Sequence, residues 1–132
     1  MIAPAAETAR QSPHGRRVLV VDDEPMLRTM MTRVLRMHGY DVTVAANGEE
    51  ALLLMGQHHF DLVLSDMVMP ICDGRCLLRE MRGRGWDIPV VILTGYAETS
   101  DVALQALGAA AVLGKPAAVS EILAALAAAL TN

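Results

Sequence analysis

Three aspartates lie directly after apolar segments of the chain. Asp22 and Asp23 follow the run 18–21, and Asp66 follows the run 62–65. If both runs are parallel strands, their carboxyl ends meet at one edge of a sheet and the carboxylates converge there. Carboxylates held close together repel one another, and a hard divalent cation with oxygen ligands relieves this repulsion. The three aspartates therefore predict a Mg²⁺ site.

Two further polar side chains are expected at the same edge. Thr94 and Lys115 each follow a later apolar run. Phosphoryl transfer to a carboxylate needs an in-line nucleophile, and its charged oxygens need a metal ion, an ammonium group and a hydroxyl. We therefore predict Asp66 as the nucleophile, Asp22 and Asp23 as metal ligands, and Thr94 and Lys115 as contacts to the phosphoryl oxygens.

The elements that position these residues follow from the alternation of apolar runs with helical periodicity. Five strands are predicted at 18–21, 41–45, 62–65, 89–93 and 111–113. Helices are predicted between them, from Pro25 to the residue before Gly39, and at 49–57, 74–82, 99–107 and 120–130. This alternation predicts an α/β fold, a flavodoxin-like doubly wound sheet of five parallel strands in the order 2-1-3-4-5 with five helices.

Some helix positions allow a finer prediction. Ser120 is expected to cap the last helix, and Asp73 is expected in a loop or at a helix N-terminus. Met26, Met30 and Met37 form a stripe beside the core stripe of the first helix. We interpret the stripe as a wide core face, with docking of a partner helix as the alternative.

Four segments of the chain combine the polar residues above with their neighbours: Val20–Pro25 (VVDDEP), Asp66–Gly74 (DMVMPICDG), Leu93–Ala97 (LTGYA) and Gly114–Pro116 (GKP). Together they resemble the response-regulator receiver family of two-component signalling. Each segment ends a predicted strand, in the right order, and the match extends from about residue 17 to 130. The resemblance implies a receiver domain, either free-standing or part of a hybrid histidine kinase.

The resemblance also implies roles for individual residues. Asp66 would take the phosphoryl group from a histidine kinase or a histidine phosphotransfer protein, with Lys115 and Thr94 as partners. The backbone carbonyl of Val68 would be a further Mg²⁺ ligand. A cis peptide would precede Pro116, and phosphorylation would switch a protein-binding surface on the fourth helix, the fifth strand and the fifth helix.

The chain departs from the family pattern at two places. The family usually has an aromatic residue where this chain has Val112, so the usual coupling of that ring to Thr94 is not expected. Tyr96 and Val68 are expected to hinder water at the phosphoryl group and to prolong the life of the phosphoaspartate. Equal dephosphorylation rates for wild type and the Tyr96→Ala, Val68→Asn double variant would contradict this expectation.

Composition and length limit the classes of partner, the location and the domain organisation that we expect. A net charge of −4 argues against nucleic-acid binding, and no apolar run is long enough for a membrane span. We expect a cytoplasmic protein, with residues 1–16 as a disordered leader or linker and 17–131 as the receiver domain. Cys72 and Cys76 are interpreted as neutral thiols in a reducing compartment.

Three alternatives and the oligomeric state remain open from the sequence. The chain could be the receiver segment of a hybrid histidine kinase, acting as a relay intermediate, with residues 1–16 as its linker. Because no output domain is expected after the last helix, we expect the output to be a protein contact or a relay step. A Mg²⁺ phosphatase of the haloacid dehalogenase group needs a second aspartate where this chain has Val68. A flavodoxin needs a phosphate cradle, which Asp22 and Asp23 would repel. We expect a regulatory switch rather than an enzyme, and a monomer or a weak dimer.

Overall fold

The computed structural model describes residues 15–131 except residue 96, and it contains one parallel five-stranded sheet. The strand order is β2-β1-β3-β4-β5, and all four pairings are parallel. The strands are β1 (Arg17–Val21), β2 (Asp41–Ala45), β3 (Leu62–Asp66), β4 (Val90–Thr94) and β5 (Ala111–Gly114). The helices are α2 (Pro25–Met37), α3 (Gly48–Gln57), α4 (Gly74–Gly83), α5 (Ala97–Ala106) and α6 (Val119–Thr131). The predicted flavodoxin-like fold is confirmed.

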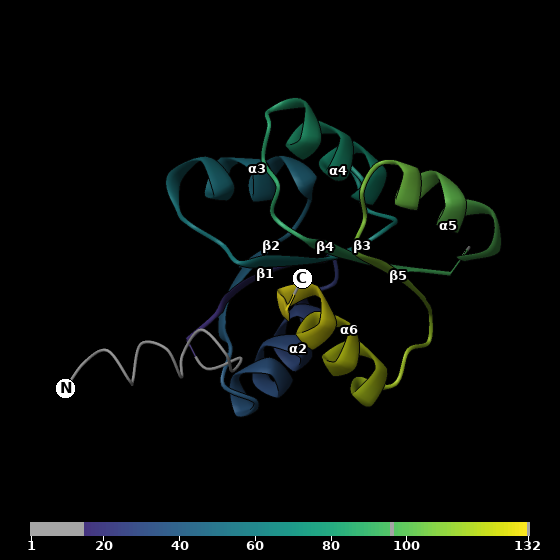
Figure 1. Cartoon of the computed structure of the whole chain (residues 1–132). Coiled ribbons are helices and arrows are strands. Elements are labelled where there is room, and N and C mark those ends of the chain that lie inside the picture. Colours follow the sequence, from purple (N-terminus) through teal and green to yellow (C-terminus); the bar gives the residue numbers. More distant parts are fainter. Residues whose placement is uncertain (1–14, 96, 132) are drawn as a thin grey trace.

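The sheet lies between two layers of helices. Helices α3, α4 and α5 cover one face, and α2 and α6 cover the other (Figure 1). Successive residues of β1 alternate between two core clusters, with Leu19 and Val21 on the first face and Val18 and Val20 on the second. Both faces are therefore buried, which explains why the central strands are continuous apolar runs.

Local signals set the ends of several helices as the sequence predicts. Pro25 occupies the first turn of α2, and Gly39, just beyond its end, has a φ of 91°. Asp73 caps α4, because its side chain accepts a hydrogen bond of 2.8 Å from the backbone N–H of Cys76. Among the described helices, none is long and apolar enough to cross a membrane.

The core interpretation of the methionine stripe is wrong. Met26, Met30 and Met37 are 82%, 51% and 77% exposed. Leu35, on the neighbouring stripe of α2, is fully buried against the sheet. The sheet covers the side of the helix that carries Leu35. The three methionines lie on another side of the helix, which faces solvent.

Ser120 is not the cap of the last helix. Helix α6 begins at Val119, and the Glu121 side chain accepts a hydrogen bond of 3.0 Å from the backbone N–H of Ala118. This is the glutamate half of a capping box, with Ala118 at the N-cap.

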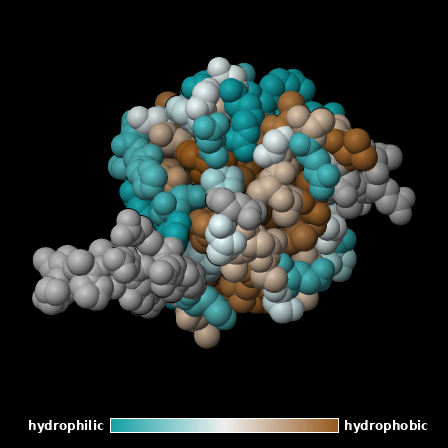
Figure 2. All heavy atoms as spheres, in the orientation of Figure 1, coloured by the Kyte–Doolittle hydropathy of each residue, from teal (hydrophilic) through white to brown (hydrophobic). Residues whose placement is uncertain are grey.

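Apolar residues gather on the surface over α6 in the middle of the face shown in Figure 2, where the alanine-rich helix lies.

The prediction of two free thiols is also wrong. Cys72 and Cys76 form a disulfide, with their Cα atoms 5.3 Å apart. Asp73 caps α4, so Cys72 lies just before the cap and Cys76 lies in the first turn of the helix. Their Cα separation is in the range that a disulfide spans.

Candidate functional site

The three predicted carboxylates meet at the carboxyl edge of the sheet. Asp22 follows β1 and Asp66 ends β3, and these two strands are direct neighbours, with Val21 paired to Ser65. Carboxylate oxygens of Asp22, Asp23 and Asp66 lie within 4.8 Å of one another. Asp22 and Asp66 are each 8% exposed, whereas Asp23 is exposed. The edge therefore offers one oxygen cluster that is half enclosed by protein and half open to solvent.

Backbone contacts orient the two buried carboxylates. The N–H of Glu24 donates to Asp22 Oδ1 at 3.0 Å, and the N–H of Met67 donates to Asp66 Oδ1 at 3.0 Å. Arg28, one turn into α2, donates to the carbonyl oxygen of Asp22 at 2.7 Å. The loop after each strand thus turns back onto the aspartate that it follows.

Lys115 reaches the same aspartate from the end of β5. Its Nζ lies 2.7 Å from Asp66 Oδ1, the oxygen that also accepts from Met67. Because both contacts hold one oxygen, the second oxygen of Asp66 is directed away from them. The Lys115–Pro116 peptide is cis, as predicted, and Lys115 N–H donates to the Thr94 carbonyl at 2.9 Å.

The cluster carries an excess of negative charge. Burial, more than any other cause, raises the pKa of Asp22, and repulsion from Asp66 and Asp23 raises it further. The Glu24 N–H and Lys115 act in the opposite direction. Three ionised carboxylates beside one ammonium leave two negative charges, which a divalent cation would balance. Clustered carboxylate oxygens at a partly open edge fit Mg²⁺, which keeps several waters and takes few protein ligands.

Thr94 and Val68 lie at the same edge of the sheet as this centre. Thr94 ends β4 and is 1% exposed. Val68 follows Asp66 by two residues, and its side chain is 61% exposed. Val112 is partly buried against the core and pairs with Ile92 in the sheet. Tyr96 lies outside the described residues.

Two features near the site were not predicted from the sequence. A cavity of about 440 Å³ opens between α2 and α6, with Leu27 and Ile122 among its apolar lining residues, and reaches Asp22, Asp66 and Lys115. The Cys72–Cys76 disulfide joins the loop that follows Asp66 to the first turn of α4. The sequence contains a signal for the disulfide, because the two cysteines are four residues apart beside a helix cap. The cavity has no such signal, because only the packing of the helices reveals it.

The sequence of this chain is similar to those of known proteins. The model of the response regulator receiver domain family matches residues 18–127. Response regulator MprA of Mycobacterium sp. (strain KMS) is 40% identical over 109 residues, which are 82% of this chain and 47% of MprA. The chain thus spans about half the length of the curated relatives it matches.

Solved structures agree in fold. The receiver domain of the Francisella response regulator 1452 superposes with a TM-score of 0.83 and 29% identity, covering 89% of this chain and 98% of that one. Response regulator TrrA of Thermotoga maritima, solved in complex with Mg²⁺–BeF, has a TM-score of 0.78 and 32% identity over 86% of this chain and 98% of that one. Fold, site and relatives together show that this chain belongs to the response regulator receiver domain family of two-component signalling.

Proposed function

We propose that this receiver domain accepts a phosphoryl group on Asp66 in a reaction that requires Mg²⁺. The observation that carries the proposal is the contact of 2.7 Å between Lys115 Nζ and Asp66 Oδ1, beside two further carboxylates. The ammonium holds one Asp66 oxygen and leaves the other to attack phosphorus. TrrA, which is similar in fold, was solved with Mg²⁺–BeF.

Each residue of the edge has a part in this reaction. Asp22, Asp23, Asp66 and the backbone carbonyl of Val68 would hold Mg²⁺, which neutralises charge on the phosphoryl oxygens when bound. Lys115 would move from the Asp66 oxygen to a phosphoryl oxygen as that charge develops. The Thr94 hydroxyl, at the end of the next strand, would donate a hydrogen bond to another oxygen.

The donor in this proposal is a phosphohistidine on a histidine kinase or a histidine phosphotransfer protein in the cytoplasm. The exposed methionines of α2 begin with Met26, in the first turn of the helix and nearest the phosphoacceptor edge, and together with Arg33 they line a second hollow along the helix. Soft methionine side chains adapt to the apolar face of a partner helix. Phosphorylation would then shift α5, β5 and α6 toward a second state that binds another protein.

Acetyl phosphate tests the proposal directly. Intact mass after incubation with Mg²⁺ should rise by one phosphoryl group in wild type, and by none in Asp66→Asn or when a chelator removes the metal. Asp87→Asn, an exposed aspartate in the loop after α4, is the matched control and should be phosphorylated as wild type is. An adduct on Asp66→Asn, or one that forms equally well without Mg²⁺, contradicts the proposal.

A further inference from the structure

The Cys72–Cys76 disulfide joins the loop that follows Asp66 to helix α4. Cys72 lies in the loop, and Cys76 lies in the first turn of α4, on the other side of the capping residue Asp73. We propose that this pair is a reversible redox-modification site, closed and opened by thiol–disulfide exchange, that sets the geometry of the phosphoacceptor loop. The existence of the site stands alone, whereas its effect on phosphorylation rests on the proposed function.

The disulfide encloses the residue at which α4 packs against the phosphoacceptor strand. Gly74 N–H donates to the Met67 carbonyl at 2.8 Å, which closes the loop between them. A Cβ on Gly74 would lie 2.8 Å from the Asp66 carbonyl oxygen and 3.0 Å from the Met67 Cα. The backbone of Asp66 is thus in direct contact with the segment that the disulfide ties together. Val68 lies in the loop that the hydrogen bond between Gly74 and Met67 closes.

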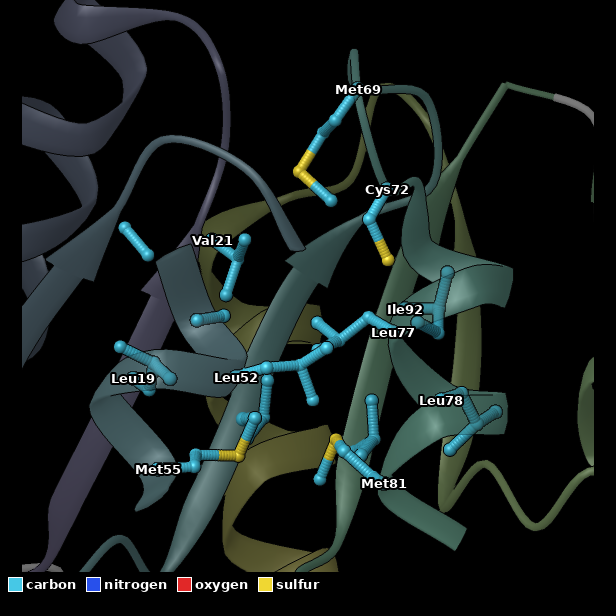
Figure 3. Packing of buried hydrophobic residues seen from close by; sticks show 14 of the residues in the cluster. Leu19, Val21, Leu52, Met55, Met69, Cys72, Leu77, Leu78, Met81 and Ile92 are labelled. Atoms are coloured by element: carbon cyan, nitrogen blue, oxygen red, sulfur yellow. The ribbon is translucent and has the colours of Figure 1, made fainter. Parts of the chain in front are cut away.

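Cys72 also connects this loop to the neighbouring helix. Gly48, the first residue of α3, donates its N–H to the Cys72 carbonyl at 3.0 Å. A Cβ on Gly48 would lie 2.8 Å from the Cys72 Sγ, so the sulfur itself is packed against the start of α3. Figure 3 shows Cys72 at the upper edge of the buried cluster, below Met69 and above Leu77. A change at this sulfur is therefore transmitted to two helices and to the loop.

The loop carries backbone strain next to the disulfide. Ile71 has a φ of 71°, and the N–H of Cys72 donates to the Pro70 carbonyl at 2.7 Å across it. This is a γ-turn of the rare, strained hand, and a positive φ is unusual for a β-branched residue. Such a conformation persists only where the surroundings hold it. Opening the disulfide removes one of these constraints and lets Ile71 relax.

The two sulfurs differ in access, which sets the direction of exchange. Cys72 is 6% exposed, whereas Cys76 is half-buried. A thiolate of a dithiol reductant attacks the Cys76 sulfur, the Cys72–Cys76 bond breaks, and Cys72 leaves as a thiolate and takes a proton. The second thiol of the reductant then displaces Cys76, which is protonated in turn. The protein gains two electrons and two protons, and the reductant becomes a disulfide.

Thiol counting on the full chain tests the existence of the site. The protein is equilibrated in mixtures of reduced and oxidised glutathione, alkylated with N-ethylmaleimide and weighed intact. We expect zero or two alkylated cysteines, interconverting reversibly as the buffer changes. A chain that keeps two free thiols, or only a mixed disulfide with glutathione, in the most oxidising buffer overturns the proposal, whatever the result with phosphate.

Mg²⁺ titration and phosphorylation test the coupling to Asp66. Residues that orient metal ligands from outside typically change metal affinity by about 10–100-fold. We expect the lower end, a roughly tenfold weaker Mg²⁺ affinity and slower phosphorylation by acetyl phosphate in the reduced protein. Cys76→Ser should behave as reduced wild type does in both buffers and should not respond to dithiothreitol.

The outcomes separate the two proposals. Equal Mg²⁺ affinity and equal phosphorylation rates in the oxidised and reduced forms overturn the coupling. If neither form is phosphorylated, the proposed function fails, and the thiol count and Mg²⁺ affinity still decide the redox site. Because the reduced wild type needs no mutation, the comparison stands even if the Cys76→Ser variant does not fold.

Discussion

Replacement of Asp22 by asparagine is expected to stabilise the metal-free protein. Asp22 is buried beside two other carboxylates, and burial raises its pKa from the usual value of 3.8. Its ionised form therefore destabilises the folded state. Asparagine removes the charge and keeps a side-chain oxygen for the hydrogen bond from Glu24 N–H.

The size of the gain follows from the geometry of the cluster. At the upper limit of 4.8 Å, each repulsion is worth about 3 kcal/mol at an effective dielectric constant of about 20. Lys115 offsets one of the two repulsions, and Asp23 is exposed and screened by solvent. A net gain of about 1–3 kcal/mol in the free energy of unfolding remains.

Urea denaturation in the presence of a chelator measures this gain. With a slope of about 2 kcal/mol/M, the midpoint should rise by about 0.5–1.5 M relative to wild type. Saturating Mg²⁺ should stabilise wild type more than Asp22→Asn, because the variant has lost a ligand, and the difference should shrink or reverse. Asp87→Asn, which removes an exposed carboxylate that attracts Arg82, is the control and should not raise the midpoint.

The pH dependence has a definite sign. The cost of ionising Asp22 is fully present above its raised folded-state pKa, and it is lost as the pH falls through that value toward 3.8. The stability advantage of Asp22→Asn should therefore be largest near neutral pH and should narrow on acidification. A variant no more stable than wild type at neutral pH without metal, or an advantage that grows as the pH falls, would refute the reasoning.

Two further predictions concern packing. Gly48→Ala should lower the free energy of unfolding by about 1–3 kcal/mol, because its Cβ would lie 2.5 Å from the Cys72 carbonyl oxygen. Gly56→Ala, where nothing lies within 4 Å, should be neutral or stabilising in the same urea titration. Leu77→Ala, fully buried, should cost about 2–5 kcal/mol. Leu53→Ala, 63% exposed, should change little, and similar losses for both leucines would contradict the assignment of the core.

Features with local causes were predictable. The strand Asp41–Ala45 has the bounds that its apolar residues and flanking turns predict. Asp73 caps α4 because its own side chain reaches the backbone N–H three residues later. Asp22 and Asp66 meet because both lie at the carboxyl ends of buried parallel strands. The strand order makes these two strands neighbours, which brings their ends together.

Features that depend on a partner elsewhere in the fold were not predictable in the same way. Met30 is half exposed although it lies on the same helix as the fully buried Leu35. Periodicity defines the apolar face of α2, but the width of that face which becomes covered depends on the sheet beside it. The disulfide likewise depends on where α4 starts relative to Cys72.

The order of the elements, the burial of the strands and the polar side chains that end them follow from the sequence alone. These properties arise from local periodicity and turn chemistry, which neighbouring residues carry. Three features depend on the folded chain: the contact of 2.7 Å between Lys115 and Asp66, the approach of Gly74 to the Asp66 backbone, and the cavity between α2 and α6. These features require segments far apart in sequence to pack at one edge, and the energy of that packing depends on the whole core rather than on any one segment.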